Sequence, residues 1–100
     1  MVFCAAVAAL FVNHSSAQDP SKVKAGEQVY QAYCSTCHGD DLQNPAPTTF
    51  DLRKLKADDR PRFVNSVLNG KGQMPPWKGA LSEEQIDQVW NFVRSRAYEK

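Results

Sequence analysis

Two cysteines and a histidine stand close together in the run Cys34-x-x-Cys37-His38. Cysteines at positions i and i+3 of a helical turn project to nearly the same side, so both thiols can react with one flat partner. A C-x-x-C-H run is the signature of a porphyrin attached through two thioethers. The adjacent imidazole can then bind the iron. The spacing therefore predicts one covalently bound haem c, held by Cys34, Cys37 and His38.

Two other kinds of site use cysteines at this spacing. A dithiol redox pair usually sits on a βαβ scaffold, and this chain has no run of β-branched residues that could form a buried parallel sheet. A structural zinc site needs four protein ligands, and beyond the motif the only other cysteine and histidine are Cys4 and His14. The sequence therefore favours haem attachment over both alternatives.

The start of the chain has the character of a secretory signal peptide. Residues 1–17 contain no Asp, Glu, Lys or Arg, and the stretch 2–12 is apolar apart from Cys4. That stretch is too short to cross a bilayer, which takes about 20 apolar residues. Small residues at 15–17 allow cleavage before Gln18, although no positive charge precedes the apolar run, which leaves the translation start open. We expect a signal peptide at 1–17, one domain at 18–100, and export to the periplasm.

Met74 is the candidate for a second axial ligand of the iron. Without residues 1–17 the chain keeps one histidine, His38, and one methionine, Met74. Glycines precede Met74 and two prolines follow it, which predicts a sharply turning loop with a stiff continuation to Trp77. A lone methionine is usually core filler. Here bis-histidine ligation is impossible, so Met74 is predicted as the sixth ligand and Trp77 as a packing residue.

Length and charge limit the other possibilities. A chain of 100 residues with 42% hydrophobic residues forms one small globular domain, and an attached apolar cofactor would enlarge its thin core. The formal net charge is +1 and there is no block of basic residues, so nucleic-acid binding has no electrostatic support. Steering toward a protein partner must come from local patches of charge.

Residues Lys22 to Cys34 have the apolar spacing of a helix whose buried face is Gly26, Val29, Tyr30 and Tyr33. Glycine inside a helix costs up to about 1 kcal/mol relative to alanine, so Gly26 is expected to allow the close approach of another helix. We expect Trp90 of the last helix to lie against this glycine.

Two further helices are predicted in the second half of the chain. One runs from about Arg60 to Leu68, after a cap at Asp58 or Asp59 and before a break at Gly70. The other follows Ser82, which forms a capping box with Gln85. Its apolar stripe is Ile86, Val89, Trp90, Val93 and Ala97, with Phe92 beside it, and Arg94, Arg96 and Lys100 suit the negative end of its dipole.

The stretch Asp40–Asp51 has no helical or strand period and contains two prolines, so it is predicted to be a loop. A ligating histidine needs a hydrogen bond at its second ring nitrogen to fix the tautomer. We expect a carbonyl of the Pro45–Pro47 stretch to accept that bond from His38, and Phe50 and Leu52 to turn inward over the haem.

These features together resemble the small class I bacterial cytochromes c, over about residues 22–97. The resemblance is carried by Gly26-x-x-x-Tyr30, by the motif with Gly39 after it, and by the stretch from Asn69 to Trp77. The family implies an all-α fold with crossing first and last helices around one haem, His38/Met74 ligation and one-electron transfer. The Met-Pro-Pro-Trp run is also similar to cytochromes that serve periplasmic dehydrogenases, including quinoprotein alcohol dehydrogenases.

Three functions remain to be separated. The first is a diffusible periplasmic electron carrier, not an enzyme, that meets dehydrogenase, reductase or oxidase partners transiently as a monomer, with no nucleic acid and no membrane insertion after signal removal. The second is a cytochrome subunit of a dehydrogenase complex. The third is a haem enzyme or gas sensor with a labile sixth ligand, which the pairing of His38 with Met74 disfavours because it leaves no open position on the iron.

Overall fold

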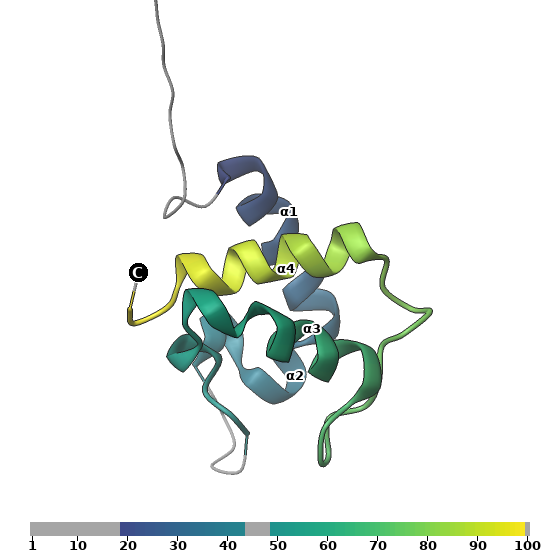
Figure 1. Cartoon of the computed structure of the whole chain (residues 1–100). Coiled ribbons are helices and arrows are strands. Elements are labelled where there is room, and N and C mark those ends of the chain that lie inside the picture. The colour runs from purple at the N-terminus through teal and green to yellow at the C-terminus, as the bar shows by residue number, and fades with distance from the viewer. Residues whose placement is uncertain (1–18, 44–48, 100) are drawn as a thin grey trace, which may run out of the picture.

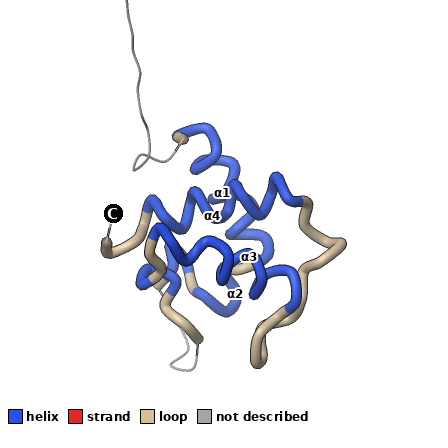
Figure 2. Tube along the Cα trace, viewed as in Figure 1, coloured by secondary structure: helices blue, strands red, loops and turns tan. Residues whose placement is uncertain are grey.

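The computed structural model describes residues 19–43 and 49–99, and all their regular structure is helical apart from two isolated bridges (Figure 2). This confirms the predicted all-α class. The predicted signal peptide lies outside the described residues. The α-helices are α1 (Pro20–Tyr33), α2 (Ser35–His38), α3 (Arg60–Asn69) and α4 (Glu83–Ser95), and the short 3-10 helices are η1 (Asp40–Leu42), η2 (Leu52–Lys54) and η3 (Ala57–Asp59).

The first predicted helix is α1, and it begins two residues earlier than its apolar spacing indicated. Asp19 is its N-cap, and the Asp19 carboxylate accepts a hydrogen bond from the backbone N–H of Ser21 at 2.9 Å. Pro20 occupies the first turn, where a backbone N–H has no partner within the helix, so the absence of an N–H in proline costs no hydrogen bond. The aspartate and the proline are themselves a sequence signal for a helix start, which the apolar spacing alone did not include.

The first and last helices cross, as the family resemblance implied, and α4 passes across α1 in Figure 1. Gly26 marks the closest approach. A Cβ at this position would overlap the backbone carbonyl of Gln88 and lie 3.0 Å from Cβ of Phe92. The predicted close packing at Gly26 is therefore confirmed, but its predicted partner, Trp90, is wrong. Gln88 and Phe92 are one helical turn apart and face α1, whereas Trp90 packs on Phe63 of α3.

α4 has the predicted N-terminus and the predicted buried stripe. The Ser82 hydroxyl accepts from the N–H of Gln85 at 3.1 Å, and the Gln85 side chain accepts from the N–H of Ser82 at 2.9 Å. These two bonds satisfy N–H groups that the first helical turn leaves without partners. All the predicted apolar positions are buried, namely Ile86, Val89, Trp90, Phe92, Val93 and Ala97.

Arg94 lies in the last turn of α4, as predicted, and also makes a contact that the sequence did not indicate. Its side chain is buried, and Nη1 donates to the backbone carbonyl of Leu55 at 2.7 Å. A guanidinium is tolerated in the interior when its donors are used in this way. Arg94 thus ties α4 to the segment that precedes η3, and the apolar period of α4 gave no sign of it.

α3 occupies the predicted region and ends at the predicted glycine. Phe63 and Val67 are its buried residues, and Gly70 at its C-terminus has a φ of 78°. Asp59 stands at the N-cap, but its carboxylate accepts from the N–H of Lys56 at 2.9 Å instead of capping α3. No helix in the part of the chain that the structure describes is long and apolar enough to cross a membrane.

Three charged side chains join three helices on one side of the fold. Asp87 of α4 accepts from Nζ of Lys22 in α1 at 2.9 Å and from Nη2 of Arg60 in α3 at 3.0 Å. One carboxylate therefore bridges all the long helices. This cluster and the α1–α4 crossing hold the turn after α1, which carries the two cysteines.

Candidate functional site

The predicted attachment residues stand on the short turn that joins α1 to α2. The N–H of Cys34 donates to Tyr30 at 2.8 Å, and the Cys34 carbonyl accepts from the N–H of His38 at 3.0 Å. Cys34 is half-buried, Cys37 is exposed, and both thiols are free. Continuous helical bonding thus holds both thiols and the imidazole on one rigid turn.

Burial gives Cys34 the wrong properties for dithiol redox chemistry. Burial first, and then the neighbouring Cys37, raises the pKa of Cys34 to about 12. At neutral pH this thiol keeps its proton. Redox-active cysteines have a lowered pKa, because the thiolate is the nucleophile. Cys34 therefore does not have the properties of the nucleophile of a dithiol redox pair.

His38 is half-buried and oriented by a backbone carbonyl. Its Nδ1 lies 3.2 Å from the carbonyl oxygen of Phe50. Burial lowers the pKa of His38, and the Phe50 carbonyl opposes only part of this effect. The ring is therefore neutral at neutral pH. With the proton on Nδ1 donated to Phe50, the lone pair of Nε2 is available to a metal.

The acceptor for His38 lies farther along the chain than predicted. Pro45–Pro47, where it was expected, lie outside the described residues, and the described acceptor is Phe50. A backbone carbonyl carries no sequence signal, so residue types could not identify it. Leu52 turns into the core as predicted, but the Phe50 side chain is 42% exposed and stacks under Arg62 at 5.1 Å. The Phe50 ring is therefore not part of the core, and its predicted position over the haem stays a prediction.

Met74 stands in a narrow turn that is tied back to the end of α3. Lys71 and Met74 exchange two backbone hydrogen bonds, at 2.9 and 3.1 Å. Gly70 is required before this turn, because a Cβ there would lie 2.6 Å from the carbonyl oxygen of Met74. After the turn, the N–H of Trp77 donates to the carbonyl of Val67 at 2.8 Å. These bonds explain why a loop so rich in glycine and proline holds one conformation.

The side chain of Met74 packs against the same core as Cys34, and Trp77 is half-buried beside it. Trp77 meets Tyr33 edge to face, with ring centroids 5.3 Å apart. Tyr33 was predicted on the buried face of α1, but it is 38% exposed and lies at the edge of that face. This aromatic pair connects the end of α1 to the methionine loop.

Tyr30 fixes the backbone immediately after the motif. Its ring is buried against Phe92, with centroids 5.2 Å apart, and its hydroxyl donates to the carbonyl of Gly39. Burial raises the pKa of Tyr30 far above its ordinary value of 10, so the hydroxyl stays a donor. Apolar spacing placed Tyr30 in the core correctly. It could not show which acceptor the buried hydroxyl would use.

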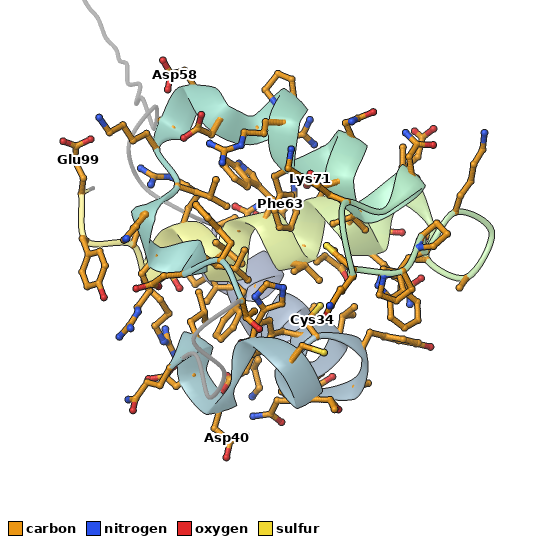
Figure 3. All side chains as sticks on the ribbon, turned by 90° about the horizontal axis from the view of Figure 1, so that it is seen from below. Cys34, Asp40, Asp58, Phe63, Lys71 and Glu99 are labelled. Carbon is orange, nitrogen blue, oxygen red and sulfur yellow. The ribbon has the colours of Figure 1, made fainter. Side chains whose placement is uncertain are left out.

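The residues present fit a haem. Two thiols, a neutral imidazole and a thioether are the donor groups that c-type haem attachment and ligation use. Other half-buried apolar side chains pack against the same core as Cys34 and Met74, namely Val64, Leu68 and Trp77. In Figure 3, Cys34 lies on the α1–α2 side of the molecule, and Phe63 and Lys71 lie on the α3 side across from it. The assignment of Cys34 and Cys37 as attachment residues, and of His38 and Met74 as iron ligands, stays a prediction.

A family model described as "Cytochrome C oxidase, cbb3-type, subunit III" matches residues 21–93, which span the cysteine–histidine motif and the methionine loop. The chain belongs to the cytochrome c family. Its helical fold and crossing terminal helices are those of the small class I type, and membership makes it an electron-transfer protein that uses haem.

Individual relatives differ in size. The chain is 33% identical over 92 residues to cytochrome c6 of Gracilaria tenuistipitata var. liui, covering 88% of this chain and 85% of that protein. It is 31% identical over 83 residues to quinohemoprotein alcohol dehydrogenase ADH-IIG of Pseudomonas putida, covering 81% of this chain but 11% of that protein. It is 35% identical over 82 residues to the cbb3-type cytochrome c oxidase subunit FixPc of Rhizobium leguminosarum bv. viciae, covering 77% of this chain and 29% of that protein.

A solved structure has the same fold. The chain superposes on quinohemoprotein alcohol dehydrogenase ADHIIG of Pseudomonas putida HK5 with a TM-score of 0.70 and 26% identity, covering 94% of this chain and 15% of that one. The cytochrome therefore resembles both a small cytochrome of similar length and a short part of larger redox proteins.

Proposed function

We propose that this cytochrome is an exported monohaem electron carrier. Cys34 and Cys37 would attach the haem through two thioethers, and His38 and Met74 would ligate its iron. The observation that carries the proposal is the single rigid turn bearing both thiols and a neutral imidazole whose Nδ1 faces the Phe50 carbonyl. A bound haem supplies one-electron Fe(III)/Fe(II) chemistry.

His38 acts as the proximal ligand through its orientation. The Phe50 carbonyl holds the proton on Nδ1 and so directs the Nε2 lone pair to the metal. The lowered pKa of His38 keeps this lone pair free of a proton at neutral pH. The imidazole is thereby ready to bind without a protonation step.

Met74 would supply a thioether ligand to the iron. A thioether ligand favours the ferrous state and raises the reduction potential. The hydrogen-bonded turn with Lys71 and the return to α3 hold Met74 in place, so ligation persists in both oxidation states with little rearrangement. Persistent ligation also excludes oxygen and other small ligands, which suits a carrier and not a haem enzyme or gas sensor.

We assign residues 1–17 to a signal peptide and 18–100 to the cytochrome domain, with the periplasm as the compartment. The apolar, uncharged first stretch supports export. Covalent haem attachment outside the cytoplasm is consistent with this assignment. Edman sequencing or intact mass of the protein from a periplasmic extract tests it, and a mature protein that retains residues 1–17 would contradict it.

Optical spectra of the purified protein test the central proposal. We expect the narrow ferrous bands of a six-coordinate haem c and, in the oxidised form, a far-red band from thioether-to-iron charge transfer. Mass spectrometry of the denatured protein should give the mass of the polypeptide plus one haem. Haem that separates into acidified acetone would refute attachment through Cys34 and Cys37. Absence of the far-red band in the wild type would refute Met74 as a ligand.

A second candidate is a cytochrome subunit of a dehydrogenase complex. It is favoured by the structural similarity to the Pseudomonas putida quinohemoprotein alcohol dehydrogenase, of which the chain matches only a short part. Co-purification with a larger protein at high salt would support this role. Elution alone, with rapid reduction by an added dehydrogenase, would support the diffusible carrier.

A further inference from the structure

Asp51, the residue after Phe50, is held by an unusual number of donors. Its carboxylate accepts from the backbone N–H, Nε and Nη2 of Arg53, at 3.0, 3.0 and 3.2 Å. It also accepts from the hydroxyl of Tyr98 at 2.9 Å. Bidentate pairing of a guanidinium with a carboxylate fixes orientation as well as adding energy. The backbone at Asp51 is therefore held far more firmly than is usual for a loop.

Tyr98 belongs to the C-terminal tail, and its contacts are directional. Its N–H donates to the carbonyl of Arg53 at 2.9 Å, and the Arg53 guanidinium stacks over its ring at 5.0 Å from the centroid. The side chain is 62% exposed, so Tyr98 contributes little to the core. Its role must lie in these contacts. We call Asp51, Arg53 and Tyr98 the tail clamp.

The tail clamp acts next to the carbonyl that orients His38. Phe50 and Asp51 are adjacent, so fixing the Asp51 side chain restricts the peptide group whose oxygen faces Nδ1 of His38. From the other side, Arg62 of α3 stacks on the Phe50 ring. The Phe50 carbonyl is thus supported by α3 and by the C-terminal tail.

We propose that the tail clamp positions the Phe50 carbonyl and thereby sets the strength of the hydrogen bond from His38 Nδ1. Tyr98 and Asp51 are then positioning residues that act through Phe50 on His38, and Tyr98 lies 60 residues after His38 in the sequence. A stronger bond at Nδ1 makes an imidazole a more basic ligand, which favours the ferric state. The proposal rests on the proposed role of His38 as axial ligand.

Two variants test the clamp in the haem-loaded protein. Tyr98→Phe removes one hydrogen bond to Asp51 and keeps the ring under Arg53, and Asp51→Asn weakens every charge-assisted bond of the clamp. Matched controls are Glu99→Gln, a neighbouring charge on the same tail, and Asp58→Asn, an exposed acid. The readouts are the solvent-exchange rate of the His38 Nδ1 proton, followed by NMR with nitrogen-15 histidine, and the midpoint potential.

We expect exchange to be about twofold faster in Tyr98→Phe and roughly fivefold to tenfold faster in Asp51→Asn, the effect of losing part or all of one hydrogen bond. The midpoint potential should rise in the same order, with both controls at wild-type values. Wild-type exchange and potential in both clamp variants would overturn the proposal. A wild-type protein without a slowly exchanging Nδ1 proton would also overturn the proposal, because the bond to Phe50 would be missing. Ring nitrogen-15 signals of His38 with no paramagnetic shift in the oxidised protein would instead overturn the proposed axial role of His38.

Discussion

Gly26 of α1 packs directly on the backbone carbonyl of Gln88 in α4, with no room for a side chain between them. The obstacle is main chain, which cannot rotate away as a side chain can. Because the turn after α1 carries Cys34 and Cys37, this contact also fixes where the thiols lie relative to the core.

Gly26→Ala should therefore destabilise the protein although alanine is the better helix former. We expect a loss of about 2–3 kcal/mol, from overpacking against fixed backbone, and a larger loss for Gly26→Leu. Thermal and urea denaturation measure it. Gly79→Ala is the comparison, because its Cβ would meet no atom within 4 Å and the strain comes only from a φ of 87°. An unchanged melting temperature for Gly26→Ala would show that the helices lie farther apart.

Met74→Ala should open the iron to external ligands and lower the midpoint potential markedly, because a thioether favours the ferrous state. Carbon monoxide should then bind the reduced variant at neutral pH, and not the wild type. Met74→Leu separates chemistry from packing. It keeps the volume against the core, so it should bind carbon monoxide as Met74→Ala does while losing less stability. A wild-type potential in either variant would refute ligation by Met74.

Asp87 makes the fold sensitive to acid. Hydrogen bonds from Lys22 first, and then Arg60, lower the pKa of Asp87 below its ordinary 3.8. A lowered carboxylate pKa adds stability that is present above pH 3.8 and is lost as pH falls through the folded-state value. Asp87→Asn should lower the free energy of unfolding by about 1 kcal/mol at pH 7. Below about pH 4 the stability of this variant should fall less steeply with pH than that of the wild type. Urea titrations from pH 2.5 to 7 measure both. An equal loss at pH 7 and pH 2.5 would show that charge is not the cause.

Tyr30 should make the folded protein less stable at alkaline pH. Its pKa is raised by burial, so the folded chain keeps the phenolic proton to higher pH than the unfolded chain does. The associated stability is complete below pH 10 and decreases as pH rises above it. Tyr30→Phe should remove this decrease, at a cost of about 1–2 kcal/mol at neutral pH for the unpaired Gly39 carbonyl. Tyr33→Phe is the control. Alkaline unfolding unaltered by Tyr30→Phe would assign this decrease in stability to another group.

Local signals predicted the helices well. The capping box of Ser82 and Gln85 and the apolar stripe that follows are encoded within a few residues, so α4 could be recognised without the fold. The same holds for Gly70, since only glycine suits a positive φ beside the Met74 carbonyl. The predicted haem-binding residues rest on local signals too, because C-x-x-C-H spacing and the scarcity of histidine and methionine are properties of the sequence itself, and this assignment stays a prediction.

Contacts between distant segments were harder to predict. Gln88 and Trp90 lie on nearly opposite faces of α4, because two residues correspond to about 200° of rotation. An apolar stripe that is broad enough to contact two helices does not show which part of it packs on α1 and which on α3. Phe50 was placed inward for its hydrophobicity, yet its ring lies outward under Arg62, and its backbone carbonyl lies 3.2 Å from Nδ1 of His38. Arg94 shows the same difficulty, since burial of a guanidinium depends on a carbonyl far away in sequence.

The pairing of α1 with α4 also governs when the domain can close. Lys22 and Asp87, which link these helices, lie 65 positions apart. A chain that is synthesised from its N-terminus therefore cannot pair α1 with α4 until the residues of α4 have been made. Until then Cys34 lacks the helix against which α1 packs and stays open to covalent chemistry. We expect alkylation of Cys34 before haem attachment to be fast in a chain ended ahead of Leu81 and slow in the full chain. Equal rates would show that α4 does not protect the thiol. If Cys34 carries the haem as proposed, the order of helices along the chain would leave a period during synthesis in which the haem can be attached.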